Sequence, residues 1–252
     1  LNIQTDLSIV ALVGDKMKSH PGISGRMFSA LGRNGVNVRA IAQGSSERNI
    51  SAVIATADIK KALNVLHEEF FEVAYKQVNV FIAGTGNVGG KLLAQLAQQQ
   101  EYLQQNLRIQ LRVVGLTNSR KMHFNDEGID LKNWKEIVNG GEAADLDAFI
   151  SKIHSKNLRN SVFVDVTATE KVAHAYDRIF SRSISIVACN KIACSSPYSY
   201  YKKLKDLARD HNVSFLFETK GGAMVLSKGT SNDLLRSGEH VNKMEAVLSG
   251  TL

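Results

Sequence analysis

The sequence has 252 residues, enough for one large domain or two of ordinary size. Hydrophobic residues make up 44% of it and aromatic residues 7%, the balance of a globular protein with a buried core. No stretch approaches the roughly 20 consecutive apolar residues of a membrane-spanning helix. The first residues also lack the basic segment and apolar block of a signal peptide. We therefore expect no membrane partner.

The sequence carries a net charge of +7, from 31 Lys and Arg residues against 24 Asp and Glu residues. A protein that binds nucleic acid concentrates such charge on one face, often with aromatic residues between the cations. Here the basic residues are scattered, and their densest groups are short, as at Lys202, Lys203 and Lys205. We therefore expect a solvated surface and no nucleic-acid partner, with a few cations left for a phosphorylated small molecule.

The two cysteines, Cys189 and Cys194, stand five positions apart without a cluster of Cys or His residues around them. This pattern argues against a disulfide framework and a zinc site, and it fits a reducing, cytoplasmic location. The sequence begins at Leu1 rather than at a Met and ends at Leu252 inside a strand-like run. We therefore expect a fragment of a longer protein.

Residues 1–75 predict a small unit with the order strand, helix, strand, strand, helix. Apolar, β-branched runs predict strands at 7–14, 36–41 and 50–54, and helical spacing of apolar residues predicts helices at 24–31 and 59–66. Asp58 is expected to cap the second helix, and a closing strand has room at 73–75. This order is typical of a ferredoxin-like α/β sandwich.

From Val78 onward, strands and helices alternate as in a parallel sheet covered by helices. The expected strands lie at 78–83, 108–116, 161–166, 183–188 and 213–217, and the expected helices at 145–153, at 198–207 and after the glycines at 84–89. In the helix after the glycines, Val88, Leu92 and Leu96 are expected to face the core. We assign residues 76–220 to a Rossmann-type, doubly wound α/β domain and residues 221–252 to the start of a substrate or dimerisation domain.

A glycine-rich loop follows the first strand of this sheet. Its residues match G-x-G-x-x-G between a buried strand and a helix, the context that dinucleotide binding requires; they are Gly84, Thr85, Gly86, Asn87, Val88 and Gly89. The first glycine allows a tight turn, the second lets a pyrophosphate approach the backbone, and the third lets helix and strand pack closely. Backbone N–H groups and the helix dipole would hold the phosphates. The alternative is a glycine-rich turn without a ligand.

The end of the second strand bears on the choice of cofactor. An NAD enzyme places Asp or Glu there for the ribose 2′-OH, whereas an NADP enzyme places an Arg nearby. This sequence continues through Asn118, Ser119, Arg120 and Lys121 without an acidic residue, and the last three could hold a 2′-phosphate. We therefore expect NADP, with NAD possible and an ordinary basic loop as the alternative.

Two later strand ends carry polar residues. Asn190 and Lys191 follow the strand at 183–188, so we expect them at the carboxyl edge of the sheet, where ligands bind. A lysine there can exchange a proton with an oxygen undergoing hydride transfer, anchor a charge, or simply lie on the surface. Asp165 and Thr167 end another strand, where the Thr167 hydroxyl can line the cleft or cap the next helix.

Together these residues resemble a known family. The segment from Gly44 to Ser51 resembles the second regulatory ACT module of aspartokinases. The strand with its glycine loop, together with Asn118-Ser119, Asp165-Val166-Thr167 and Asn190-Lys191, resembles homoserine dehydrogenase. Their order on one chain is similar to that of the bifunctional aspartokinase/homoserine dehydrogenases, over nearly the whole sequence.

The resemblance implies the reversible, NADPH-dependent reduction of aspartate 4-semialdehyde to homoserine. It implies that Lys191 is a catalytic lysine, and that Thr167 and Asn190 join the glycine loop as cofactor contacts. Glu218, followed by Thr219, falls on a glutamate that holds a monovalent cation together with backbone carbonyls.

The ACT resemblance implies feedback by an amino-acid effector, threonine, with Asn37 and Gln43 as its contacts. This segment is similar to ACT modules that dimerise, and an isolated small sandwich leaves one face of its sheet exposed. We therefore expect a homo-oligomer.

The sequence departs from the family pattern in two places. After Thr219 the family has Asn-Val-Gly-Ala-Gly-Leu-Pro, where this sequence has Lys-Gly-Gly-Ala-Met-Val-Leu at 220–226, and the match resumes near Asn232. The change falls on the expected cation site. The sequence also ends where the family's substrate domain begins and lacks the kinase domain expected before Leu1, so we expect the fragment alone to be inactive.

Two alternatives stay open. Another NADP-dependent dehydrogenase would explain the glycine loop but not the segment from Gly44 to Ser51. A non-catalytic module that senses an amino acid and a nucleotide would be compatible with the altered segment at 220–226.

Overall fold

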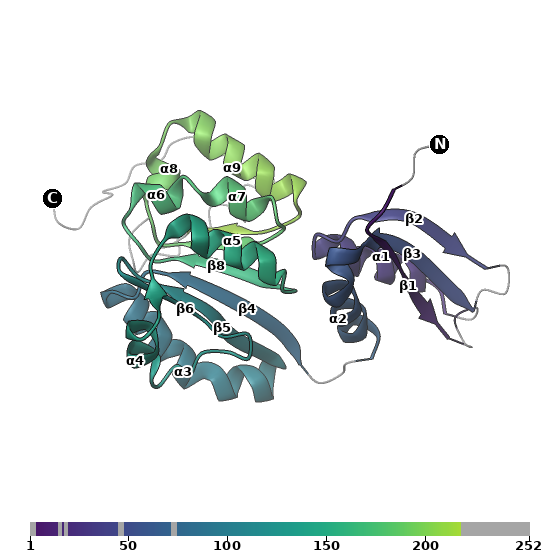
Figure 1. Cartoon of the computed structure of the whole chain (residues 1–252), viewed down its shortest axis with the longest axis horizontal. Coiled ribbons are helices and arrows are strands. Elements are labelled where there is room, and N and C mark those ends of the chain that lie inside the picture. Colours follow the sequence, from purple (N-terminus) through teal and green to yellow (C-terminus); the bar gives the residue numbers. More distant parts are fainter. Residues whose placement is uncertain (1–3, 15–16, 18–19, 45–47, 72–74, 218–252) are drawn as a thin grey trace, which may run out of the picture.

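The computed structural model of the chain describes residues 4–14, 17, 20–44, 48–71 and 75–217. These residues form two α/β units, each with its own sheet (Figure 1). The smaller unit comes first along the chain, and the larger unit begins with the strand that starts at Lys76. One cluster of buried apolar side chains fills the smaller unit, and two fill the larger unit.

The smaller unit is an antiparallel sheet with two helices on one face. Its strands are β1 (Leu7–Val13), β2 (Val38–Gln43) and β3 (Asn49–Ala55), in the order β1-β3-β2. The helices are α1 (Ile23–Arg33) and α2 (Ile59–Phe70). Along β3 every second residue is buried against them, because the side chains of a strand point to alternate faces of its sheet. The predicted ferredoxin-like arrangement is therefore confirmed.

The other face of this small sheet carries exposed apolar side chains. Ile9 and Val13 of β1 are 72% and 70% exposed, whereas Val10 and Leu12 point into the core. Val53 of β3 pairs with Ile9 and lies half-buried beside it. The face that the helices do not cover is therefore partly apolar.

Two details of the smaller unit differ from the prediction or lie beyond it. Asp58 precedes α2, but its side chain makes no capping hydrogen bond. Its Oδ1 instead accepts a hydrogen bond of 2.7 Å from Asn157 Nδ2 of the larger unit, so a tertiary contact takes the place of the cap. Of the strand expected at 73–75, the first two residues lie outside the described residues, and Tyr75 belongs to no strand.

The larger unit is built on a sheet with the order β10-β9-β8-β4-β5-β6-β7. Its parallel strands are β4 (Lys76–Ala83), β5 (Ile109–Thr117), β8 (Ser161–Asp165), β9 (Ser185–Ala188) and β10 (Phe215–Leu216). These five strands are the ones predicted from the sequence, so the doubly wound sheet is confirmed. The short antiparallel edge strands β6 (Lys121–Phe124) and β7 (Glu142–Ala143) were not predicted, because two to four residues are too few to show an alternating pattern.

Helices cover both faces of this sheet (Figure 1). One face carries α3 (Asn87–Leu107) and α4 (Trp134–Asn139). The other face carries α5 (Leu146–Lys156), α6 (Glu170–Ala173), α7 (Tyr176–Phe180), α8 (Ile192–Ser195) and α9 (Tyr198–Asp210). The central strand β4 serves both cores, because Val80 and Ile82 pack on the α3 side while Phe81 and Ala83 pack on the α5 side. Within the described ranges, each helix falls short of the length or the apolar composition that crossing a bilayer requires.

The buried face of α3 differs from the prediction. Val88 is 58% exposed, whereas Gly89 and Leu93 are buried and Leu92 and Leu96 are partly buried. The first turn of α3 follows the loop that leaves the carboxyl end of β4, so Val88 stands outside the packed layer. The core contacts of the helix begin at Gly89.

Candidate cofactor-binding site

A cleft of about 1120 Å³ opens at the carboxyl ends of β4, β5 and β8, and we call it the cofactor cleft. It lies where the strand order reverses, since β5 extends the sheet on one side of β4 and β8 on the other. Open α/β sheets bind ligands at such a switch point, because the loops on its two sides diverge. The walls include residues 83–86, 117–120, 144–147 and 166–167.

The three glycines of the loop differ in why the position lacks a side chain. Gly84 has a φ of +102°, which residues with a side chain rarely adopt, and a Cβ there would lie 2.8 Å from the Val166 carbonyl oxygen. A Cβ on Gly89 would overlap the Gly84 carbonyl oxygen. A Cβ on Gly86, in contrast, would meet nothing within 4 Å. The fold itself therefore requires Gly84 and Gly89, whereas Gly86 leaves the kind of open space that a pyrophosphate occupies.

The amino end of α3 adds anion-binding capacity beside the glycines. The helix has 21 residues and starts at Asn87, after Gly86 at the N-cap, which has no side chain to cap it. The first hydrogen bond that returns to the N-cap runs from Gly90 N to Gly86 O, so the preceding N–H groups have no partner within the helix. These groups and the helix dipole favour a phosphate. Thr85 and Gly86 line the cleft, while Asn87 lines a neighbouring hollow below α4.

The turn after β5 presents Arg120 to the cleft. Asn118 Oδ1 accepts hydrogen bonds from the N–H groups of Arg120 and Lys121, at 2.8 and 2.7 Å, so the Asn118 side chain shapes the turn. Ser119 and Arg120 are exposed and line the cleft together with Asn118. Lys121 Nζ instead donates to the Gly141 carbonyl at 3.0 Å, and Lys121 is absent from the lining of the cleft. Of the two predicted cations, the structure thus brings Arg120 alone to the glycine loop.

A buried carboxylate organises the end of β8. Asp165 is fully buried, and its Oδ1 accepts hydrogen bonds from the N–H and the hydroxyl of Thr167 at 2.8 and 2.7 Å. Its Oδ2 accepts from Tyr176 Oη at 2.6 Å and from Asn190 Nδ2 at 3.0 Å. Burial, followed by the adjacent carboxylate, raises the pKa of Tyr176 far above its ordinary value, so the phenol stays a donor. This network fixes Thr167 at the cleft wall.

The same network reaches the two predicted residues after β9. Asn190 is 2% exposed, and its Nδ2 also donates to the Thr169 carbonyl at 2.9 Å, so its side chain ties the turns after β8 and β9 together. Lys191 follows at the N-cap of α8 and is exposed. No hydrogen bond or ion pair of its ammonium occurs among the described residues, and Lys191 does not line the cofactor cleft. The structure places Lys191 at the carboxyl edge of the sheet, one residue after Asn190, whose side chain is hydrogen-bonded to the cleft wall.

One wall of the cleft carries charged side chains that the sequence did not predict. Lys171 and His174 from the region of α6, Arg178 from α7, and Asp145 and Asp147 at the start of α5 all line it. Arg178 forms an ion pair with Asp147 across the cleft wall. Lys171, His174 and Arg178 come from two very short helices that the apolar pattern did not reveal. Asp145 and Asp147 lie at the start of the predicted helix α5, where no motif marks them.

The two predicted effector residues lie at opposite ends of β2. Asn37 precedes the strand and Gln43 ends it, and both are exposed. Six residues of extended chain span about 20 Å. One amino acid cannot contact both side chains of the same copy of the chain.

The expected cation ligand, Glu218, lies outside the described residues, as does the altered segment at 220–226. Within the described part, no group of three or more His, Cys, Asp or Glu residues is placed to hold a metal ion. Cys189 and Cys194 are both thiols and half-buried. The metal prediction therefore stays untested.

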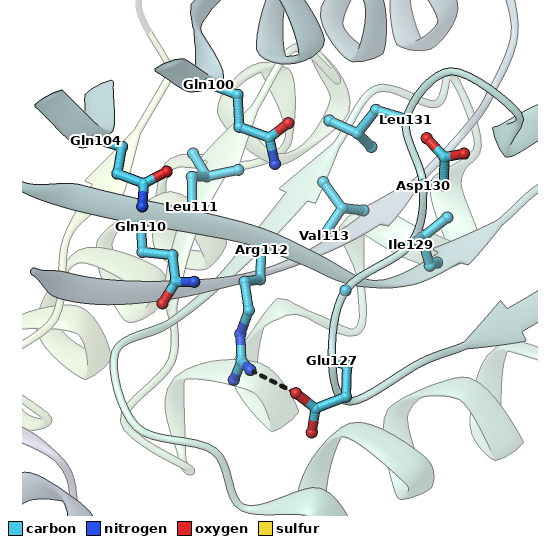
Figure 2. A pocket seen from close by; sticks show the side chains of 11 residues that line it. Gln100, Gln104, Gln110, Leu111, Arg112, Val113, Glu127, Ile129, Asp130 and Leu131 are labelled. Atoms are coloured by element: carbon cyan, nitrogen blue, oxygen red, sulfur yellow. Dashed lines mark ion pairs between the residues drawn. The ribbon is translucent and has the colours of Figure 1, made fainter. Parts of the chain in front are cut away.

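A separate cavity of about 320 Å³ lies between α3 and β5 (Figure 2). Leu111 and Val113 point into it, with Gln100 and Gln104 of α3 above them (Figure 2). It shares no lining residue with the cofactor cleft, and its lining mixes amide, charged and apolar side chains, so we assign it no role.

Comparison with known proteins agrees with this geometry. The ACT domain family matches residues 10–70, and the homoserine dehydrogenase NAD-binding domain family matches residues 84–218, more than half of the chain. The chain belongs to the homoserine dehydrogenase family. Its amino-terminal unit is an ACT domain, so the combination inferred from the sequence is confirmed.

Relatives from a plant and a bacterium match the whole chain. It is 40% identical over 254 residues to bifunctional aspartokinase/homoserine dehydrogenase 2, chloroplastic, of Arabidopsis thaliana, and covers 28% of that relative. It is 37% identical over 253 residues to bifunctional aspartokinase/homoserine dehydrogenase of Haemophilus influenzae, and covers 31% of it. The chain thus spans less than a third of the length of these curated relatives.

Among solved structures, homoserine dehydrogenase from Thermoplasma acidophilum is similar, with a TM-score of 0.51 and 17% identity. The match covers 64% of this chain and 49% of that one. At this level of identity the likeness concerns the fold alone, and it agrees with the Rossmann-type sheet.

Proposed function

We propose that this homoserine dehydrogenase chain supplies the NADP-binding part of an enzyme that interconverts aspartate 4-semialdehyde and homoserine, in a protein that also carries aspartokinase. The observation that carries the proposal is the glycine loop. Gly86 of this loop lines a cleft at the switch point of the sheet, in the domain that matches the homoserine dehydrogenase family.

We assign the residues in and beside the cleft different roles. The N–H groups at the start of α3 bind the pyrophosphate, and Gly86 allows its approach. Thr167, fixed by Asp165, supports the cleft wall beside the bound cofactor. When bound, NADPH supplies the hydride. The ammonium of Lys191 stabilises the negative charge that develops on the substrate oxygen and passes a proton to it.

Preference for NADP over NAD is proposed from the turn after β5. Arg120 faces the cleft, and no carboxylate stands at the end of β5 to accept from a ribose 2′-OH. A guanidinium forms short, strong hydrogen bonds with a phosphate, so a 2′-phosphate is favoured here.

Titration of NADPH fluorescence, with and without aspartate 4-semialdehyde, tests the proposed function. The chain alone is expected to bind NADPH without turnover, and the complete protein is expected to oxidise it once the semialdehyde is added. Binding without oxidation in the complete protein would instead favour a nucleotide-sensing module. No binding in either would contradict the cofactor role itself.

The ACT domain is proposed to bind an amino-acid effector, threonine, at an interface between two copies of the chain. The apolar sheet face with Ile9 and Val13 leaves surface for a second copy. Because Asn37 and Gln43 of one copy are too far apart, they would contact one effector only if each came from a different copy. A monomer in light scattering at all concentrations, with threonine present, would contradict this.

A reducing compartment is proposed from the two half-buried thiols, Cys189 and Cys194. We favour the cytoplasm. The relative from Arabidopsis thaliana is chloroplastic by name, and that compartment is the alternative.

A further inference from the structure

A cavity of about 350 Å³ lies where α2 of the ACT domain meets the larger unit, and we call it the seam cavity. Lys60, Lys61 and Asn64 of α2 line one side, and Asn79 of β4 and Arg112 of β5 line the other. It shares no lining residue with the cofactor cleft. It lies toward the amino ends of the strands, where β4 starts beside α2 (Figure 1), whereas the cofactor cleft lies at their carboxyl ends.

Polar contacts fix the two sides of this cavity to each other. Arg159 Nε forms an ion pair of 2.7 Å with Glu68 of α2, and both side chains are largely buried, with exposed fractions of 14% and 16%. Asn160 N donates to Asn34 Oδ1 at 3.0 Å, and Asn157 bonds to both Lys61 and Asp58. The seam cavity is therefore a built feature rather than an accidental gap.

The lining of the cavity is strongly cationic. It contains five basic side chains and two carboxylates: Lys60, Lys61, Arg112, Lys156 and Arg159 against Asp126 and Glu127. Lys156 is neutralised by Asp126, and Arg159 by Glu68 from outside the lining. The carboxylate of Glu127 is 91% exposed and 3.8 Å from Arg112, so water screens that pair. Among the described residues, Lys60 has no ion-pair partner, Lys61 has only the nearby charge of Asp58, and most of the charge of Arg112 remains without compensation.

Lys61 is the unusual member of this set. It is 8% exposed, and its Nζ donates to the neutral Asn157 Oδ1 at 2.8 Å. No carboxylate lies within ion-pair distance of it in the described part of the chain, although Asp58 is linked to it through Asn157. Burial lowers the pKa of Lys61, and the charge of Asp58 offsets this only in part. Buried lysines are normally paired with a carboxylate, whereas the Lys61 ammonium has three N–H donors and donates to Asn157.

Arg112 is held rigidly on the opposite side. Its Nε and Nη2 donate to Asn79 Oδ1 at 3.3 and 3.0 Å, and Asn79 is itself 1% exposed and donates to the Arg159 carbonyl at 2.6 Å. Its guanidinium projects from β5 on the side away from Leu111 and Val113 (Figure 2). It reaches the seam cavity with its position already set.

We propose that the seam cavity binds a small anion that carries carboxylate or phosphate groups, between Lys61 and Arg112. The volume falls near the lower end of the range of about 300–1,000 Å³ that is typical of small-molecule sites. An anion there supplies the charge that the buried ammonium lacks, and it contacts the ACT domain and the dehydrogenase domain at once. Carboxylates and phosphates both fit paired cationic donors, so the experiment has one arm for each.

The test follows the side-chain amide signals of Asn79 and Asn157 by NMR while sodium phosphate, or separately sodium succinate, is titrated into the chain at constant ionic strength. Both amides border the seam cavity and not the cofactor cleft, so phosphate bound by the glycine loop does not produce the signal. We expect saturable shifts of both amides in at least one arm, and the stronger arm names the anionic group. No saturable shift in either arm, or the same shifts with sodium chloride alone, would overturn the proposal.

Variants locate the binding. Lys61→Met keeps the unbranched side chain up to the position of the ammonium and removes its charge, and it should weaken binding about tenfold or more, as expected for the loss of one hydrogen bond to a charged group. Lys60→Gln, at an exposed position that tolerates change, should weaken it by a smaller factor and serves if Lys61→Met does not fold. Lys202→Gln removes an exposed charge on α9, outside the lining of the seam cavity, and should have no effect. Wild-type affinity in both seam variants would contradict the site.

Discussion

The two ends of the central sheet are built on different chemistry. At the carboxyl end the cofactor cleft depends mainly on the backbone: the positive φ of Gly84, the bare Cα of Gly86 and the unpaired N–H groups of α3. At the amino end the seam cavity depends on charged side chains, chiefly Lys61 and Arg112, from two different domains. A site made of backbone is fixed by one short run of sequence, whereas a site made of distant side chains exists only after the domains have packed.

If the carboxyl end is the reacting end, Lys191 should carry the largest effect. In the complete protein, Lys191→Ala should lower turnover about 10²–10³-fold, equivalent to about 2.7–4 kcal/mol of electrostatic stabilisation. The affinity for NADPH should stay within about twofold, because the lost interaction forms only in the transition state. Steady-state kinetics and NADPH titration measure both quantities.

Two substitutions serve as controls for that experiment. Lys191→Arg should restore little, because the planar guanidinium cannot take the position of the ammonium. Lys202→Ala on α9 removes an exposed charge and should leave turnover unchanged. If Lys191→Ala kept near-wild-type turnover and lost only thermal stability, Lys191 would be a structural residue.

The backbone character of the cleft is tested by a pair of neighbouring glycines in α3. Gly89→Ala should destabilise the chain by about 1–3 kcal/mol, because its Cβ would overlap the Gly84 carbonyl and force the backbone apart. Gly90→Ala meets its nearest side chain, Trp134, at 3.7 Å and should be neutral or stabilising by up to about 1 kcal/mol. Urea denaturation of both variants gives the comparison. Equal stabilities would show that the close approach at Gly89 is not tight.

A pair of tyrosines measures how far the cleft depends on the buried Asp165. Tyr176→Phe removes a hydrogen bond to this carboxylate and should cost about 1.5–3 kcal/mol of stability. Tyr200→Phe removes a bond of 2.8 Å to the neutral Ala173 carbonyl and should cost about 0.5–1.5 kcal/mol. Denaturant titrations compare the two. A larger loss for Tyr200→Phe would mean that Asp165 is satisfied without Tyr176.

Arg120 and Lys121 test the choice between NADP and NAD. Arg120→Ala should weaken NADPH binding by about 1–3 kcal/mol and leave NADH binding nearly unchanged, because only NADPH carries the 2′-phosphate. Lys121→Ala should change NADPH binding less, since the Lys121 ammonium is bonded to the Gly141 carbonyl. Equal losses for NADPH and NADH in fluorescence titrations would contradict the role of Arg120.

The same contrast explains what the sequence could reveal. The strands of the doubly wound sheet and the glycine loop were predictable, because local patterns of apolar residues and glycines specify them. The edge strands β6 and β7 and the helices α6 and α7 were too short for such patterns, so the cleft wall with Lys171 and Arg178 was missed. Asp58 was assigned to a helix cap on local grounds, and a contact with Asn157, 99 residues away, took its carboxylate instead.

The seam cavity lies beyond sequence analysis for the same reason. Lys61 follows a second lysine, Lys60, at the start of α2, and nothing local indicates that the Lys61 side chain is buried. Its burial follows from the contact of α2 with residues 157–160 of the larger unit. Domain packing, rather than any motif, creates that site.

The affinity of Gly86→Ala for NADPH decides whether this cleft binds the cofactor, because a Cβ at this glycine meets no protein atom within 4 Å. We expect a folded variant that loses no more than about 1 kcal/mol of stability from the change at the N-cap. Its affinity for NADPH should fall about tenfold or more, because the methyl group fills the space through which the pyrophosphate approaches the backbone. Gly90→Ala, four residues along the same helix, should bind NADPH as the wild type does. An unchanged affinity in Gly86→Ala would contradict the assignment of this cleft to the cofactor.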